Sequence, residues 1–179
     1  MSTEVPHLAV VLTPVASAPA LAGLCAMSDI DVHVVPSRAG AVAVIELTPA
    51  QPAPPSEDWD ISELLGGQGD EVPAEADSLA RDLSRLSKAG VVLITSALAQ
   101  DAGIETGLSG QLTARQYAGG EPGEEVAVGL VLAGADDVVE DLVLARIPVT
   151  EVRGHQRSGD LPRWKAARMF AKGLRRPRP

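Results

Sequence analysis

The stretch Ala74–Leu98, AEADSLARDLSRLSKAGVVLITSAL, decides the fold class because it joins an amphipathic helix directly to an apolar strand. Leu79, Leu83 and Leu86 recur at helical spacing, which lays one apolar stripe along the predicted helix. The chain then continues from Val91 to Leu98 as a short apolar run, which is typical of a buried strand. A helix followed at once by a buried strand predicts a domain that contains both α and β structure.

The residues before this stretch predict one more helix and three more strands. Apolar and alternating runs indicate strands at 7–15, 30–35 and 41–47, with a helix at 17–27 between the first two. The Pro-Ser-Arg-Ala-Gly turn at 36–40 favours a hairpin between the second and third strands. With the helix and strand of 74–98, the order becomes β-α-β-β-α-β, which is that of a split βαβ (ferredoxin-like) unit.

Downstream, the pattern predicts a strand at 111–117 and a second, smaller βαβ unit. Its strands are expected at Val126–Ala133 and Ile147–Val152, with a short helix at Ala135–Ala145 between them. We therefore predict an α/β (α+β) fold. The expected architecture is a two-layer sandwich with a mixed sheet of about five to seven strands and two or three helices packed on it.

Charge divides the chain into two parts of opposite sign. Residues 1–150 hold 22 acidic and 6 basic side chains, whereas residues 151–179 hold 2 acidic and 9 basic ones. The length of 179 residues suits one domain. We predict a single acidic domain over 1–153 with a Pro- and Gly-rich acidic insertion at 49–73, followed by a basic tail over 154–179.

The tail is predicted to form an amphipathic helix that opens after Asp160. On a helical wheel, apolar positions 167, 170, 171 and 174 gather opposite most of the cations. A basic helix of this kind can bind a protein partner, nucleic acid or an anionic membrane surface, or it can pack on its own acidic domain. The predicted partner-binding residues are Arg163, Trp164, Lys165, Arg168, Phe170, Lys172, Arg175 and Arg176.

A second candidate partner-binding segment lies in the acidic insertion. Residues 56–65, SEDWDISELL, mix acidic side chains with the apolar residues Trp59, Ile61, Leu64 and Leu65. A tethered acidic and apolar segment can dock as a helix into a groove, and it can also pack on its own domain.

No pattern in the sequence indicates a catalytic, cofactor or metal site. His7, His33 and His155 have no ligand spacing, and the chain has neither a phosphate-binding Gly-Lys loop nor a GxGxxG turn. The acidic run Asp136-Asp137 with Glu140-Asp141 is explained by a helix N-terminus and a solvated face more simply than by Mg²⁺. We predict no cofactor, and we leave enzymatic activity open while leaning against it.

The predicted function is a non-enzymatic binding or adaptor module that engages a protein partner, or its own second subunit, through the basic helix. One alternative is a small-molecule or enzymatic domain with a pocket near Thr13–Ser17 and Thr95–Ala97, and a second is a nucleic-acid accessory protein. No apolar run is long enough for a membrane span, and one Cys excludes an internal disulfide. We expect a cytoplasmic protein, and its Ala- and Arg-rich composition is typical of a high-GC bacterium.

Overall fold

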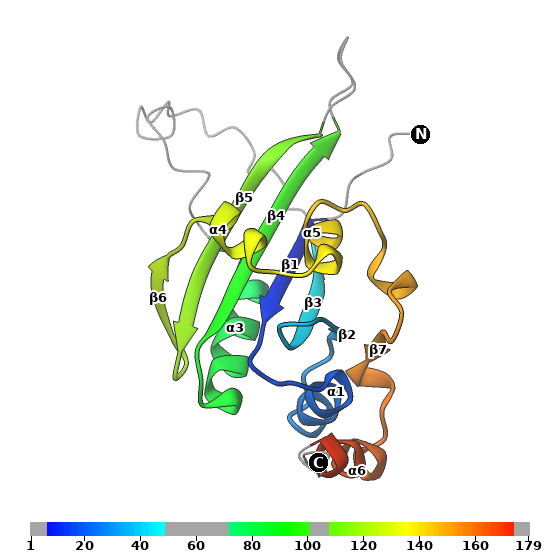
Figure 1. The fold of residues 1–179 in the computed structure, drawn as a ribbon. Helices are drawn as coiled ribbons and strands as arrows, with labels where there is room; N and C mark the ends of the chain where they lie inside the picture. Colours follow the sequence, from blue (N-terminus) through cyan, green and yellow to red (C-terminus); the bar gives the residue numbers. More distant parts are fainter. Residues whose placement is uncertain (1–6, 49–71, 101–107, 174–179) are drawn as a thin grey trace, which may run out of the picture.

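A computed structural model describes residues 7–48, 72–100 and 108–173 (Figure 1). The chain forms a seven-stranded sheet and five α-helices within these residues. In chain order the elements are β1 (His7–Leu12), α1 (Ala18–Met27), β2 (His33–Pro36), β3 (Ala41–Leu47), α3 (Ala74–Ser87), β4 (Val91–Gln100), β5 (Leu108–Ala118), β6 (Glu121–Glu125), α4 (Val128–Ala133), α5 (Asp137–Val143), the 3₁₀ turn η1 (Val149–Glu151), β7 (Gln156–Arg157), the 3₁₀ turn η2 (Ser158–Asp160) and α6 (Arg163–Gly173).

The sheet has the strand order β6-β5-β4-β1-β3-β2-β7, and every pair of neighbours is antiparallel. The prediction of a mixed sheet is therefore wrong. Consecutive strands such as β2 and β3 form hairpins, which are antiparallel by construction. The helical connections from β1 to β2 and from β3 to β4 each skip one strand, so the parallel partners they join are never adjacent.

One face of the sheet is covered by α1 and α3, and the contact is made of small and branched apolar residues. Leu21 and Cys25 of α1 and Leu79 and Leu83 of α3 are almost fully buried there. Tyr117 of β5 joins the same cluster. The helices predicted at 17–27 and at the start of the stretch Ala74–Leu98 are thus confirmed as elements that build this core.

The other face is covered by α4, α5 and η1, so the prediction of two layers is wrong. Val139, Leu142 and Val143 of α5 are buried against residues of the central strands. The expected strand at 126–133 is the helix α4, and the expected strand at 147–152 contains η1. A short apolar run does not by itself tell a helix from a strand, and here both segments pack on the face of the sheet.

The two edges of the sheet are short strands. β6 has five residues, all exposed, and includes Pro122 and three glutamates. β7 has only two residues. Short, charged or proline-containing edges oppose pairing with another chain, so the edges are poor places for strand addition.

Candidate functional site

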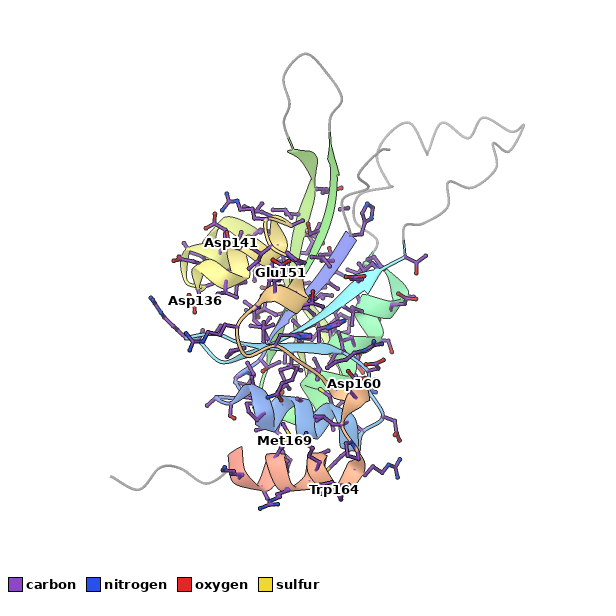
Figure 2. The ribbon with its side chains drawn as sticks, turned by 90° about the vertical axis from the view of Figure 1, so that its right-hand side faces the viewer. Asp136, Asp141, Glu151, Asp160, Trp164 and Met169 are labelled. Carbon is purple, nitrogen blue, oxygen red and sulfur yellow. The ribbon has the colours of Figure 1, made fainter. Side chains whose placement is uncertain are left out.

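The C-terminal helix α6 packs along the outer side of α1, on the face that α1 turns away from the sheet (Figures 1 and 2). The two helices approach closely because small residues line their contact. A methyl group added at Gly23 would lie 2.5 Å from the carbonyl oxygen of Ala166 and 3.0 Å from the backbone nitrogen of Phe170. A methyl group added at Gly173 would clash with the side chain of Ala20.

This contact explains why α1 has no polar face. A helix that is apolar all round must be buried on all sides. Leu21 and Cys25 of α1 are buried toward the sheet, while Ala20 and Gly23 lie against α6. The helix is therefore the middle layer between the sheet and the C-terminal helix.

The contact face of α6 differs from the predicted one by one position. Ala166 is buried and Phe170 is half-buried, whereas Ala167 and Ala171 are exposed. Gly23 lets the backbone of α6 approach α1 closely, so the side of α6 that carries Ala166 makes the contact. A helical wheel could not predict this, because it does not take the size of the facing side chains into account. The predicted contact residue Leu174 lies outside the described residues.

Three polar anchors hold the residues that lead into α6. Arg157 forms a bidentate ion pair with Asp31, in which two guanidinium nitrogens lie 3.0 and 2.7 Å from the two carboxylate oxygens. This hydrogen-bonded ion pair is the main cause that lowers the pKa of Asp31, against a smaller raising effect of burial. Ser158 is buried, accepts a hydrogen bond from the backbone of Val32 and donates one to the carbonyl of Ile30.

A third anchor lies at the first residue of the helix. Arg163 donates to both carboxylate oxygens of Asp29, at 3.0 and 2.8 Å. Both partners are about three-quarters exposed, so this pair orients the chain more than it stabilises it. One predicted binding residue, Arg163, is thus already paired within its own chain.

The outward side of α6 forms a surface that we call the basic face, made of Trp164, Lys165, Arg168 and Lys172. The Trp164 side chain is 70% exposed, the largest exposed fraction of any aromatic residue in the described ranges. Figure 2 shows it on the far side of the helix from α1, whereas Met169 lies on the α1 side. No ion pair reaches the three cations from residues 7–48, 72–100 or 108–173.

Of the other predicted partner-binding residues, the structure describes only Arg163 and Phe170. Phe170 is half-buried. Arg175 and Arg176 lie outside the described residues, as do Trp59, Ile61, Leu64 and Leu65 of the acidic insertion.

Two histidines that sequence analysis treated separately lie together. The Nδ1 atom of His33 is 2.7 Å from the Nε2 atom of His155, and the rings are stacked with centroids 5.0 Å apart. Burial and the nearby His33 lower the pKa of His155, while Asp160 acts in the opposite direction. The two residues are 122 positions apart, so no local spacing could have indicated the pair.

Three of the acidic residues at the start of α5 and within it are engaged in polar contacts with other residues of the chain. Asp136 accepts a hydrogen bond from the backbone of Arg38, and Arg146 bridges Glu140 and Asp141. Figure 2 shows Asp136 and Asp141 at the opposite end of the molecule from α6. Across the part of the chain that the structure describes, no group of three or more His, Cys, Asp or Glu side chains could hold a metal ion.

The hydroxyl groups that were predicted to line a pocket do not converge. Thr13 donates to the carbonyl of Ala41, and Ser96 donates to the carbonyl of Val143. Because β1 and β4 are antiparallel, Leu8 pairs with Ser96 while the other end of β1 pairs with Val92. Thr13 follows the end of β1 that pairs with Val92, whereas Thr95 and Ser96 pair with residues toward the other end of β1, so the two groups do not meet.

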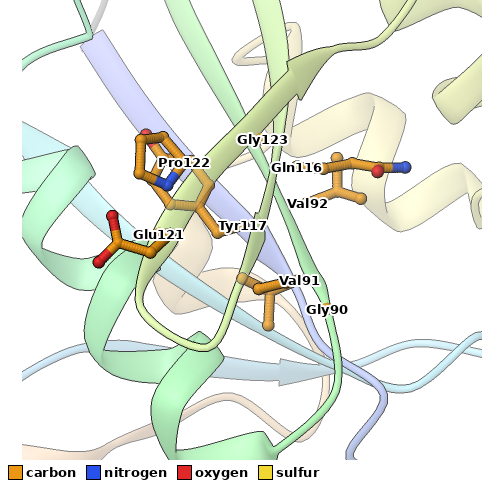
Figure 3. A pocket seen from close by; sticks show the side chains of 9 residues that line it. Gly90, Val91, Val92, Gln116, Tyr117, Glu121, Pro122 and Gly123 are labelled. Carbon is orange, nitrogen blue, oxygen red and sulfur yellow. The ribbon is translucent and has the colours of Figure 1, made fainter.

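A shallow cavity of about 360 Å³ lies elsewhere, beside the bulge between β5 and β6 (Figure 3). Its lining is mostly apolar or backbone, with Val91, Val92 and Pro122 among its side chains. The hydroxyl group of Tyr117 is already bonded to Asp77 at 2.8 Å. The cavity thus lacks the set of converging polar groups that fixes a small ligand.

Comparison with known protein families, with curated proteins and with solved structures finds no match for this chain. Within the described ranges, no helix combines the length and apolarity that crossing a bilayer requires.

Proposed function

We propose that this protein is a non-enzymatic binding module that docks an acidic segment of a protein partner on the basic face of α6. The observation that carries the proposal is the exposed Trp164 beside three cations on a helix that is fixed to the body. Tryptophan and arginine are the residues that most often dominate binding energy at protein interfaces. A rigidly held helix also loses little conformational freedom on binding, which favours affinity.

The charge of the chain favours a protein partner over a nucleic acid or a lipid surface. The segment 1–150 carries a net charge of −16, which repels an extended polyanion. This repulsion acts over a Debye length of about 8 Å at physiological salt, which is less than the diameter of a helix. A short acidic segment can contact α6 alone, whereas a duplex or a membrane would extend past it toward the body.

We also propose that β1 to β4 with α1 and α3 form a split βαβ (ferredoxin-like) unit, to which the other elements are added. The support is the strand order β4-β1-β3-β2 within the sheet together with the order β-α-β-β-α-β along the chain.

The binding proposal is tested with a labelled synthetic peptide of the sequence EEDLEELLEE, which stands for an acidic partner with apolar side chains and does not occur in this chain. Fluorescence anisotropy at 150 mM salt measures its affinity, with duplex DNA and phosphatidylglycerol vesicles as competing ligands. We expect Trp164→Ala to weaken peptide binding about tenfold or more. Replacing Lys165, Arg168 and Lys172 by Gln is expected to weaken it and to reduce its salt dependence.

Two matched controls separate this surface from general effects of charge and apolarity. Among the described residues, Leu130 is the other large apolar side chain with high exposure, at 75%, so Leu130→Ala should leave binding unchanged. Arg153 is exposed and lies outside α6, so Arg153→Gln removes one charge without touching the basic face. The proposal is rejected if the peptide does not bind, if the controls weaken binding equally, or if DNA or vesicles bind more tightly than the peptide.

A further inference from the structure

The His33–His155 pair is one of two diagonal side-chain links between β2 and the edge strand β7 with its flanking residues. In this ladder His33 pairs with Arg157 and Val34 pairs with Gln156. His155 precedes Arg157 by two residues, so it lies diagonally across from His33 on the same face of the sheet. The ion pair between Asp31 and Arg157 forms the parallel diagonal link, one step further along.

The pairing of β7 with β2 attaches the C-terminal segment to the sheet through few residues. β7 contributes only two residues to the sheet, so few backbone hydrogen bonds hold it. Side-chain contacts therefore carry much of the attachment of residues 154–160. Of these side-chain contacts, the one between His33 and His155 involves groups whose ordinary pKa lies near neutral pH.

A hydrogen bond between two imidazole rings needs one N–H donor and one unprotonated nitrogen. The pair can therefore form with both rings neutral or with one ring charged. When both rings are charged, the facing nitrogens are both donors, so the hydrogen bond is lost and two like charges face each other. Double protonation thus turns an attractive contact into a repulsive one.

Charged groups on the neighbouring elements modulate this change in both directions. Asp31 precedes β2 and is already paired with Arg157. That ion pair is the main cause that lowers the pKa of Asp31, and the charge of His33 contributes to the same effect. Asp160 of η2 favours the charged form of His155, whereas burial and His33 oppose it more strongly. The net direction is a lowered pKa for His155.

We propose that His33 and His155 form an acid-sensitive contact, which holds residues 155–157, the segment that leads into α6, beside β2 and loosens when both rings are protonated. The inference concerns how α6 is attached to the body, and it holds whether or not the basic face binds a partner.

The sign of the effect follows from the lowered pKa of His155. Above pH about 6.5 the ring is neutral in the closed and the open forms, so the contact is unaffected. Below that pH the open form takes up protons more readily, so opening becomes more favourable until the closed form is protonated as well. Each unit by which the pKa is lowered increases the opening equilibrium about tenfold.

The test is hydrogen exchange of the full chain, read by mass spectrometry and corrected for intrinsic exchange rates at pH 7.5 and 5.5. We expect protection of residues 155–160 to fall severalfold or more at the lower pH, while β1 and β4 keep their protection. His155→Gln and His33→Gln should abolish this pH dependence. His7→Gln, which removes the third histidine on β1, should leave it intact.

A second measurement does not depend on any variant. NMR titration of the imidazole protons should show a lowered pKa for His155, with its protonation accompanied by shifts of the Ser158 and Gly159 amides. The proposal is overturned if protection is independent of pH in the wild type, or falls equally in His155→Gln. It is also overturned if protonation of His155 leaves the Ser158 and Gly159 amides unshifted.

Discussion

Replacing Gly23 by Ala tests whether the contact between α1 and α6 is set by the absence of a side chain. In a solvent-exposed helix this change is stabilising by about 1 kcal/mol, because alanine has the higher helix propensity. Here the new methyl group would lie 2.5 Å from the carbonyl oxygen of Ala166, whereas ordinary contacts begin at 3.4 Å. The shortfall of about 0.9 Å must be met by moving α6, because the obstructing atom belongs to the backbone.

The expected cost follows from the overpacking of a tight contact, about 1–3 kcal/mol, against the gain of about 1 kcal/mol in helix propensity. Since the penalty falls only on the docked form of α6, the variant should undock this helix without unfolding the rest. The equilibrium for undocking should increase by about one order of magnitude, since 1.4 kcal/mol corresponds to a factor of ten.

Limited trypsin digestion measures undocking directly, because α6 itself contains Arg163, Lys165, Arg168 and Lys172. In Gly23→Ala, cleavage within α6 should become about tenfold faster, while thermal unfolding of the remaining body shifts little. Gly129→Ala is the matched control, since a methyl group at Gly129 of α4 meets no atom within 4 Å. Unchanged cleavage in Gly23→Ala, or equal acceleration in both variants, would refute the reasoning.

Two further predictions concern buried groups. Tyr117→Phe should lower the free energy of unfolding by about 1–2 kcal/mol at pH 7 in urea titrations, because it removes the hydrogen bond from Tyr117 to Asp77. Burial raises the pKa of Asp77, but the hydrogen bonds from Arg81 and Tyr117 together lower it. The deficit should therefore shrink as pH falls below about 4, and a deficit that does not depend on pH would contradict this account. Burial raises the pKa of Cys25 to about 12, so a thiol reagent at pH 8 should label it only in denaturant, and rapid labelling of the native protein would disprove that.

Periodicity predicted the elements whose residues have one clear environment. The helix at 74–87 shows one apolar stripe facing the sheet, and the strand that follows it is continuous and apolar. Such patterns arise when one side of an element faces solvent and the other side faces the core. They could not predict the second covered face, because α4 exposes Leu130 and packs without burying any residue.

The candidate site was predictable in composition but not in geometry. The basic residues and Trp164 are evident from the sequence, whereas the choice of contact strip depends on Gly23, more than 140 residues away. The His33–His155 pair is another product of tertiary structure, because only the pairing of β2 with β7 brings the two rings together. Contacts of this kind depend on which distant segments meet, which no local pattern encodes.

The position of α1 between the sheet and α6 also has a consequence for the order of synthesis. Its outer side is apolar from Ala18 to Met27, and the helix that covers it is made about 135 residues later. At roughly 5–20 residues per second, this interval lasts on the order of ten seconds. During translation the nascent chain must therefore carry an uncovered apolar helix, which makes it a candidate for chaperone binding until α6 leaves the ribosome.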